Sequence, residues 1–266
     1  MANHDVTIAG EVVRKSFRRT SRGEPAREWA ALVLLHEHAP GLAPRPIATE
    51  VDPPVVVMSR VAGTSLDTVL DLQQLTATIA AYRTLFAVPV RPDTPHRHRL
   101  PADFVQDNIE WIDDLPTGTE LPDVVRRALT EARRWHAGPP PGIDEVHDPV
   151  NAQGDSKVDN MLWDGSRVRL VDFEAFGVGD LAFEVADLAE HISSRLRGLR
   201  DPEAMIIGFD LNPAQLERVD AYRIVLATFW LLMLLPGSPG HGRNPEGSAE
   251  RQAQHLLALL DRAPAR

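Results

Sequence analysis

Two carboxylates and an amide, Asp155, Asn160 and Asp172, are the side chains in this sequence best suited to act together in a reaction. Residues 161–171 separate the last two and consist of short apolar runs around an Asp-Gly pair, a pattern that predicts a tight β-hairpin. Such a hairpin would bring Asn160 and Asp172 to the same end, where Asp155 could join them from the preceding loop. Together these groups could hold a divalent cation and orient a hydroxyl, which phosphoryl transfer requires.

A second pair of polar residues, Lys15 and Glu28, lies on elements near the N-terminus. In a strand, Lys15 would share one face with Val13 and Phe17, because side chains alternate between faces. That position is compatible with a lysine that reaches into a cleft, and also with an edge-strand lysine that opposes aggregation. Glu28 would lie on the apolar side of a helix over residues 26–37 and would need a partner there. Lys15 is the natural candidate.

The elements expected around these residues change character near residue 62. Before it, the patterns predict strands at 6–9, 11–17, 46–51 and 55–61, with the helix at 26–37. After it, they predict the hairpin, a helix that follows Asp180, and helices near 67–86, 103–114, 122–136, 213–235 and 249–261. We therefore expect an α+β protein with a β-rich domain over residues 1–61 and a helical domain over residues 62–266.

Composition excludes several other classes of protein. The 266 residues include 38 acidic and 28 basic ones, and the net charge of −10 argues against non-specific nucleic-acid binding. The same acidity is compatible with a cationic ligand or with solubility alone. Cysteine is absent, which excludes disulfides and thiolate catalysis. No secretory signal is evident, and the most apolar run, residues 224–235, is too short to cross a bilayer. A soluble, cytoplasmic protein is expected.

The motif Gly154-Asp155-x4-Asn160, with Asp172-Phe173-Glu174 and Gly179-Asp180 after it, resembles the active-site motifs of the aminoglycoside phosphotransferase family. Members of that family have a protein-kinase-like fold. The resemblance implies a bilobal protein, with a small N-terminal nucleotide-binding lobe over residues 1–61. The catalytic loop and the acceptor site would belong to the larger helical lobe, residues 62–266. It also implies ATP as the phosphoryl donor and Mg²⁺ as the cofactor.

Roles in the catalytic loop follow from the same resemblance. Asp155 corresponds to the catalytic carboxylate, which orients the acceptor hydroxyl and accepts its proton. Asn160 and Asp172 correspond to the magnesium ligands. Lys157 is similar to a lysine that protein kinases carry in this loop, where it contacts the transferred phosphate. Asp187, or Glu184 one turn earlier, resembles the acidic helix residue that braces this loop in the family, and the sequence does not decide between the two.

Nucleotide binding by the N-terminal lobe is likewise implied by the resemblance. Lys15 would hold the nucleotide phosphates, with Glu28 as its ion-pair partner. Adenine would bond to the backbone of Ser59 and Val61 in the segment that links the lobes, and Met58 would lie at the back of the pocket.

Two departures from the family pattern are visible in the sequence. Gln153 stands where the family usually has a histidine that supports the loop, so we expect a less rigid loop with its chemistry retained. Few residues precede Lys15, so we expect a curtailed N-terminal lobe in which something replaces the glycine-rich loop over the phosphates.

The resemblance implies an ATP- and Mg²⁺-dependent kinase of a small hydroxylated molecule, with an aminoglycoside-type or other cationic antibiotic as the first candidate. Two alternatives stay open. One is a kinase of a choline-like or amino-alcohol metabolite, and the other is a non-catalytic pseudokinase that binds a ligand. Neither nucleic acid nor a membrane is expected as a partner, and the oligomeric state is left open.

Overall fold

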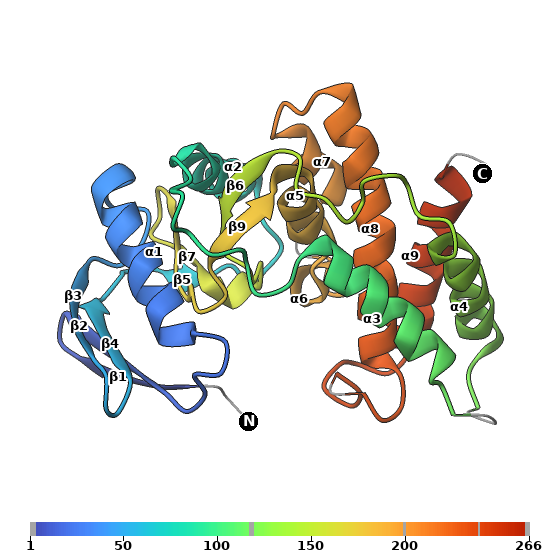
Figure 1. Ribbon diagram of the computed structural model, residues 1–266, viewed down its shortest axis with the longest axis horizontal. Coiled ribbons are helices and arrows are strands. Elements are labelled where there is room, and N and C mark those ends of the chain that lie inside the picture. Colours follow the sequence, from blue (N-terminus) through green and yellow to red (C-terminus); the bar gives the residue numbers. More distant parts are fainter. Residues whose placement is uncertain (1–3, 117–119, 199–200, 239, 264–266) are drawn as a thin grey trace. The chain divides into compact units, whose positions relative to one another are not determined.

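The N-terminal strands form one antiparallel sheet, shown in blue in Figure 1. The computed structural model describes residues 4–116, 120–198, 201–238 and 240–263. The strands follow the order β1-β2-β4-β3 and comprise β1 (His4–Ala9), β2 (Val12–Phe17), β3 (Pro46–Glu50) and β4 (Val55–Ser59). All neighbouring strands are antiparallel, and Lys15 in β2 pairs with Val6 on one side and Val56 on the other.

Apolar residues of β4 and of helix α1 (Glu24–His38) make the core beside this sheet. Val55 to Met58 are all buried, as expected for a continuous apolar run, and α1 packs against β3 and β4. Ala31, Leu32 and Leu35 are buried on the same side of α1 as Glu28. The sheet and the helix therefore place Lys15 and Glu28 where both side chains are buried.

Short strands and one helix complete this part of the chain. β7 (Met161–Trp163) and β8 (Val168–Leu170) form the predicted hairpin, with β5 (Thr64–Ser65) at its edge. β6 (Pro149–Ala152) pairs with β9 (Gly177–Asp180), and α2 (Leu72–Ala87) packs against β6 and β8. The sequence placed the start of α2 near residue 67, which is wrong because Asp71 forms a capping box with Gln74 and fixes the first turn at Leu72.

The chain divides into two compact units, residues 1–98 with 148–181, and residues 99–147 with 182–266. The first unit contains all the strands named above. The sequence predicted a nucleotide-binding lobe over residues 1–61 and a helical lobe over residues 62–266. This division by function stays a prediction. The strands and helices confirm the expected α+β class.

The second unit is helical. Its elements are α3 (Pro101–Asp113), α4 (Asp123–His136), α5 (Leu181–Glu190), α6 (Ile192–Arg195), α7 (Pro202–Ile207), α8 (Pro213–Leu234) and α9 (Ser248–Arg262). The predicted helix after Asp180 is interrupted at His191, whose ring accepts from the Ser193 amide and caps α6. The strands β6 and β9 and the short α7 were not predicted; β9 carries two glycines, which disfavour a strand assignment.

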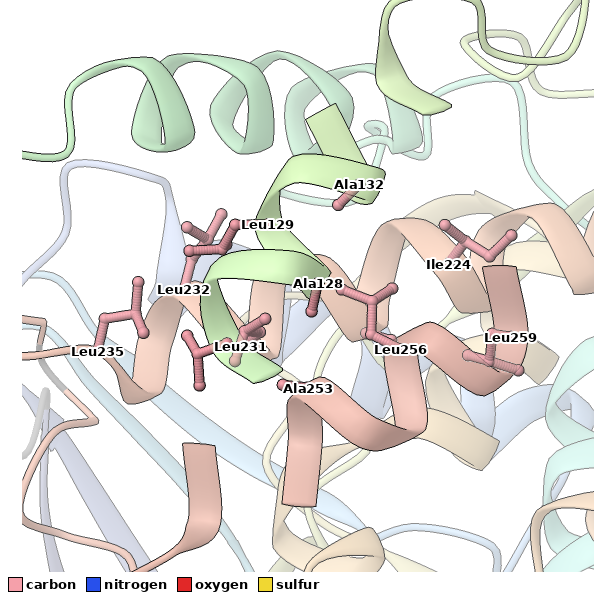
Figure 2. Packing of buried hydrophobic residues seen from close by; sticks show 12 residues of the cluster. Ala128, Leu129, Ala132, Ile224, Leu231, Leu232, Leu235, Ala253, Leu256 and Leu259 are labelled. Atoms are coloured by element: carbon pink, nitrogen blue, oxygen red, sulfur yellow. The ribbon is translucent and has the colours of Figure 1, made fainter. Parts of the chain in front are cut away.

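The core of the second unit is built on α8, most of which is buried. Leucine and alanine side chains from α4, α8 and α9 interdigitate there, among them Leu129, Leu231 and Leu256 (Figure 2). This accounts for the long apolar run in the sequence: it is a core helix, since none of the described helices is long and apolar enough to cross a membrane.

A network of charged side chains, buried at its centre, joins α5, α7, α8 and α9 of this unit. Glu190, at the end of α5, is fully buried. It accepts hydrogen bonds from Arg223 Nε of α8 at 2.8 Å and lies 2.6 Å from His255 Nε2 of α9. Arg223 also reaches the more exposed Glu203, at 2.9 Å. The network supplies the partners that a buried carboxylate needs.

Candidate active site

The hairpin brings Asn160 and Asp172 to the same end, as predicted. Met161 pairs with Leu170, and the Val171 amide donates to the Asn160 carbonyl at 3.0 Å, directly before Asp172. The Asn160 side-chain amide donates to the backbone oxygen of Asp155 at 3.3 Å and closes the preceding loop. The two motifs therefore meet in one small region of the first unit.

Asp172 has a backbone conformation that is unusual for a residue other than glycine. Its φ of 67° lies in the left-handed region, which aspartate tolerates better than most side chains do. A residue is held in such a conformation only when its surroundings fix it, and this is common at functional sites. The Asp172 carboxylate contacts Lys15, whose Nζ lies 2.5 Å from Asp172 Oδ1.

Lys15 is the centre of a cluster of charged side chains. It is 3% exposed, and its Nζ lies 2.8 Å from Glu28 Oε2, the expected partner, and 3.5 Å from Glu174 Oε2. Burial disfavours the ammonium form, but the charges of Glu28 and Asp172 outweigh it and hold the pKa of Lys15 above its usual range. Burial raises the pKa of the Glu28 carboxyl, and the Lys15 ammonium opposes that rise. Lys15 is therefore a fixed positive charge.

The glycine of the Gly-Asp motif is required by close packing. Gly154 has a φ of +87°, and a Cβ at this position would lie 2.4 Å from the Ala175 carbonyl oxygen. Arg97 Nη2 donates to the Gly154 carbonyl at 3.2 Å from the other side. The backbone just before Asp155 is thereby held against the segment that follows Asp172.

Gln153 is buried and links the catalytic loop to two neighbouring elements. Its Nε2 donates to the Val171 carbonyl at 2.6 Å, and its Oε1 accepts from the Tyr82 hydroxyl of α2 at 2.5 Å. One amide side chain thus connects the residue before Asp172 to a core helix. Tyr82 lies in the helix predicted near residues 67–86, and the helical pattern alone does not indicate this hydroxyl contact.

We expect the substitution Tyr82→Phe to lower the free energy of unfolding by about 1–3 kcal/mol, because Gln153 Oε1 would lose its donor in a buried site. Urea denaturation followed by circular dichroism would measure the change. Thr84→Val is a matched control on the same helix, since its hydroxyl is exposed, and should cost less than about 0.5 kcal/mol. Equal effects of the two substitutions would show that the Tyr82–Gln153 contact contributes little.

Lys157 has two separate contacts in the catalytic loop. Its backbone amide donates to Asp155 Oδ1 at 3.2 Å and so orients that carboxylate. Its side-chain Nζ lies 2.5 Å from Asp159 Oδ2, and both side chains are about half exposed, at 48% and 50%. A contact between Lys157 and a phosphate would have to replace this ion pair, and it stays a prediction.

A cavity of about 350 Å³ opens beside the Lys15 cluster. Lys15, Asn160 and Asp172 line one part of it, and Met58, Ser59 and Val61 are also among its lining residues. Met58 is buried, and the Ser59 amide already donates to the Arg45 carbonyl at 2.9 Å. A hydrogen bond between adenine and the Ser59 backbone stays a prediction. The remaining walls are largely apolar, from Val6, Ile8, Val13, Pro44, Leu162 and Val171.

Glu174 of the Asp172-Phe173-Glu174 motif and His4 are also part of this cluster, and His4 had no assigned role in the sequence. His4 Nδ1 lies 2.9 Å from Glu174 Oε2. His4, Asp172 and Glu174 each offer one candidate metal-ligand atom, and these three atoms lie within 4.8 Å of one another. The strand pairing of β1 and β2 places His4 opposite Phe17, on the strand next to the one that carries Lys15. A lone histidine near the N-terminus gives no spacing signal that could have identified it.

The comparisons with known proteins agree with this geometry. Residues 5–222 match the model of the phosphotransferase enzyme family, and the chain belongs to that family. The sequence-based expectation of a phosphotransferase enzyme is thereby confirmed. No curated protein sequence matches the chain.

Solved structures show the same protein-kinase-like fold. A choline/ethanolamine kinase family protein from Mesorhizobium loti is 17% identical, with a TM-score of 0.63 over 99% of this chain and 87% of that one. The ADP-bound aminoglycoside phosphotransferase APH(2'')-Ib is 15% identical, with a TM-score of 0.61 over 97% and 90%. Aminoglycoside phosphotransferase APH(4)-Ia is 17% identical, with a TM-score of 0.61 over 100% and 92%. At these identities the likeness establishes the fold alone.

Proposed function

We propose that this chain transfers the γ-phosphoryl group of ATP to a hydroxyl of a small cationic molecule, with an aminoglycoside-type antibiotic as the first candidate. The observation that carries the proposal is the Lys15 cluster. A buried ammonium between Glu28 and Asp172 borders a largely apolar cavity of a size suited to a nucleotide base. Lys15 would hold the phosphates at one end, and the Ser59–Val61 backbone would meet adenine at the other.

In this mechanism Asp155 orients the acceptor hydroxyl and accepts its proton. The Lys157 amide, which donates to Asp155 Oδ1, keeps the carboxylate in position. Gln153 and the Asn160 side chain hold the two motifs together, through Val171 and the Asp155 backbone. Most of the work of these residues is positioning, as expected for phosphoryl transfer.

Asn160 and Asp172 fit Mg²⁺, because an amide oxygen and a carboxylate are ligands that this cation prefers. A bound Mg²⁺ would neutralise charge on the nucleotide phosphates. Asp172 would have to exchange its contact with Lys15 for the cation, while Lys15 moves toward the phosphates and keeps Glu28 as its partner.

A cationic acceptor is supported by the net charge of −10. An amino-alcohol of the choline or ethanolamine type is a second candidate, favoured by the likeness to the choline/ethanolamine kinase family protein. Asp113 and Asp114 are neighbouring acidic residues that could bind the ammonium groups of such an acceptor, but Arg133 donates to the Asp113 carboxylate at 2.7 and 3.0 Å. This contact lowers the pKa of Asp113 and disfavours that pair as an acceptor site.

Thermal denaturation with and without Mg-ATP tests the nucleotide part of the proposal. A ligand at 100 times its Kd stabilises the folded state by about 2.7 kcal/mol, so we expect a clear rise in Tm at millimolar Mg-ATP. ADP release would then be measured with a panel of aminoglycosides, choline and ethanolamine. Release that depends on an aminoglycoside supports the first candidate, and release that depends only on choline or ethanolamine supports the second. No rise in Tm and no ADP release would favour a pseudokinase.

A further inference from the structure

The cluster around Lys15 has more negative than positive charge. Three carboxylates, from Glu28, Asp172 and Glu174, lie within 3.5 Å of one ammonium. With His4 neutral, the group has two negative charges in excess. Glu28 is 1% exposed, and the side chains of Asp172 and Glu174 are 26% and 19% exposed, so solvent compensates this charge only in part. A divalent cation would neutralise the excess.

The atoms that face this excess charge are arranged as metal ligands. One atom each from His4, Asp172 and Glu174 lie within 4.8 Å of one another, and His4 Nδ1 lies 2.9 Å from Glu174 Oε2. Two ligands bound at right angles to an ion, each at about 2.1 Å, are about 3 Å apart. The separation of the His4 and Glu174 atoms therefore suits two adjacent ligands of a single ion.

The imidazole decides which class of ion the site would select. Mg²⁺ takes oxygen ligands and keeps several waters, whereas Zn²⁺, Co²⁺ and related ions accept an imidazole nitrogen readily. Lys15 Nζ now contacts Asp172 at 2.5 Å and Glu174 at 3.5 Å, so an ion bound by these carboxylates would have to displace the ammonium toward Glu28, which lies 2.8 Å from it. The two sites share Asp172, but the His4 imidazole gives this one a nitrogen ligand that the Asn160–Asp172 pair proposed for Mg²⁺ lacks.

We infer that His4, Asp172 and Glu174 form a binding site for a divalent first-row transition-metal ion, with His4 Nδ1 as the ligand that distinguishes it from a magnesium site. This inference goes beyond the proposed phosphoryl transfer and does not depend on it. Because Asp172 is shared, an ion held here would compete with Lys15 for that carboxylate.

Titration of the untagged full-length protein with Co²⁺, in the absence of nucleotide, tests this inference. Visible absorption would report the coordinated ion, and Zn²⁺ and Mg²⁺ would be added as competitors. We expect Zn²⁺ to displace Co²⁺ at equal concentration and Mg²⁺ to fail even at a large excess. His4→Asn keeps a polar group near Glu174 but removes the imidazole, and should weaken Co²⁺ binding by about tenfold or more.

His38→Asn is the matched control, since His38 also lies beside a carboxylate, with its Nε2 3.7 Å from Glu37 Oε1, but is not part of the ligand cluster. It should leave Co²⁺ affinity unchanged. If His4→Asn does not fold, as judged by circular dichroism, Glu174→Gln should give the same loss of affinity. Wild-type affinity in a folded His4→Asn or Glu174→Gln variant would overturn the inference, as would displacement of Co²⁺ by equimolar Mg²⁺. Failure of ATP turnover would leave the inference unaffected, because no nucleotide is present.

Discussion

The substitution Asp155→Asn is expected to lower kcat for ATP-dependent phosphorylation by about 10²–10⁴-fold. Asparagine keeps the size of the side chain and an oxygen for the Lys157 amide, which donates to Asp155 Oδ1 at 3.2 Å. It cannot accept the proton of an acceptor hydroxyl. The loss should therefore appear in turnover, while the rise in Tm with Mg-ATP should match that of the wild-type protein. ADP release with the preferred acceptor and thermal denaturation measure the two effects.

Asp159→Asn is the matched control for this experiment, because Asp159 is another acid of the same loop. Its carboxylate is half exposed and pairs with the Lys157 side chain, an interaction worth at most about 1 kcal/mol. We expect kcat within about threefold of the wild-type value. If Asp155→Asn keeps wild-type turnover, the proposed role of Asp155 as base is wrong. If both variants lose activity equally, the loop responds to any change of charge, and the assignment of the base is also wrong.

The sequence predicted those parts of the site that depend on residues close together in the chain. The hairpin at residues 161–171 places Asn160 beside Asp172, and the Asp-Gly pair is enough to predict a hairpin there. It does not predict the register, because Trp163 pairs with Val168 and the strands are separated by four residues instead of two. Lys15 and Glu28 could be paired because each was a charge on an otherwise apolar face. In both cases the prediction used only alternation along a strand or spacing along a helix.

The rest of the site depends on contacts between segments far apart in the sequence. The second partner of Lys15 is Asp172, 157 residues later, and His4 reaches Glu174, 170 residues later. Gln153 meets Tyr82 across 71 residues. No local pattern encodes such pairings. The β6–β9 pair was missed for a related reason: Gly177 is a strand residue whose Cβ would lie 2.4 Å from the Arg97 amide, so a glycine signals close packing here and not a turn.

Substitutions in the helical unit are expected to change the stability of the protein instead of its turnover, and the largest effect is expected at Glu190. Glu190→Gln should lower the free energy of unfolding by about 3–5 kcal/mol. The reason is that Arg223, only 3% exposed, would lose its buried counter-charge, and His255 would lose the acceptor 2.6 Å from its ring. Glu203→Gln is the control on the same arginine. Its side chain is 56% exposed, so its loss should cost at most about 1 kcal/mol.

The difference in unfolding free energy between the wild-type protein and Glu190→Gln should depend on pH, which gives a second check on the role of the Glu190 charge. Burial alone would raise the pKa of Glu190, but His255 and Arg223 outweigh burial and lower it. A carboxyl group whose pKa is depressed on folding stabilises the protein above its unfolded pKa of about 4.3, and that contribution is lost as the pH falls further. The gap between wild type and Glu190→Gln in urea denaturation should thus be constant near neutrality and shrink below about pH 4.3. A gap that is under 1 kcal/mol at neutral pH, or that does not change on acidification, would mean that the Glu190 charge does not stabilise this unit.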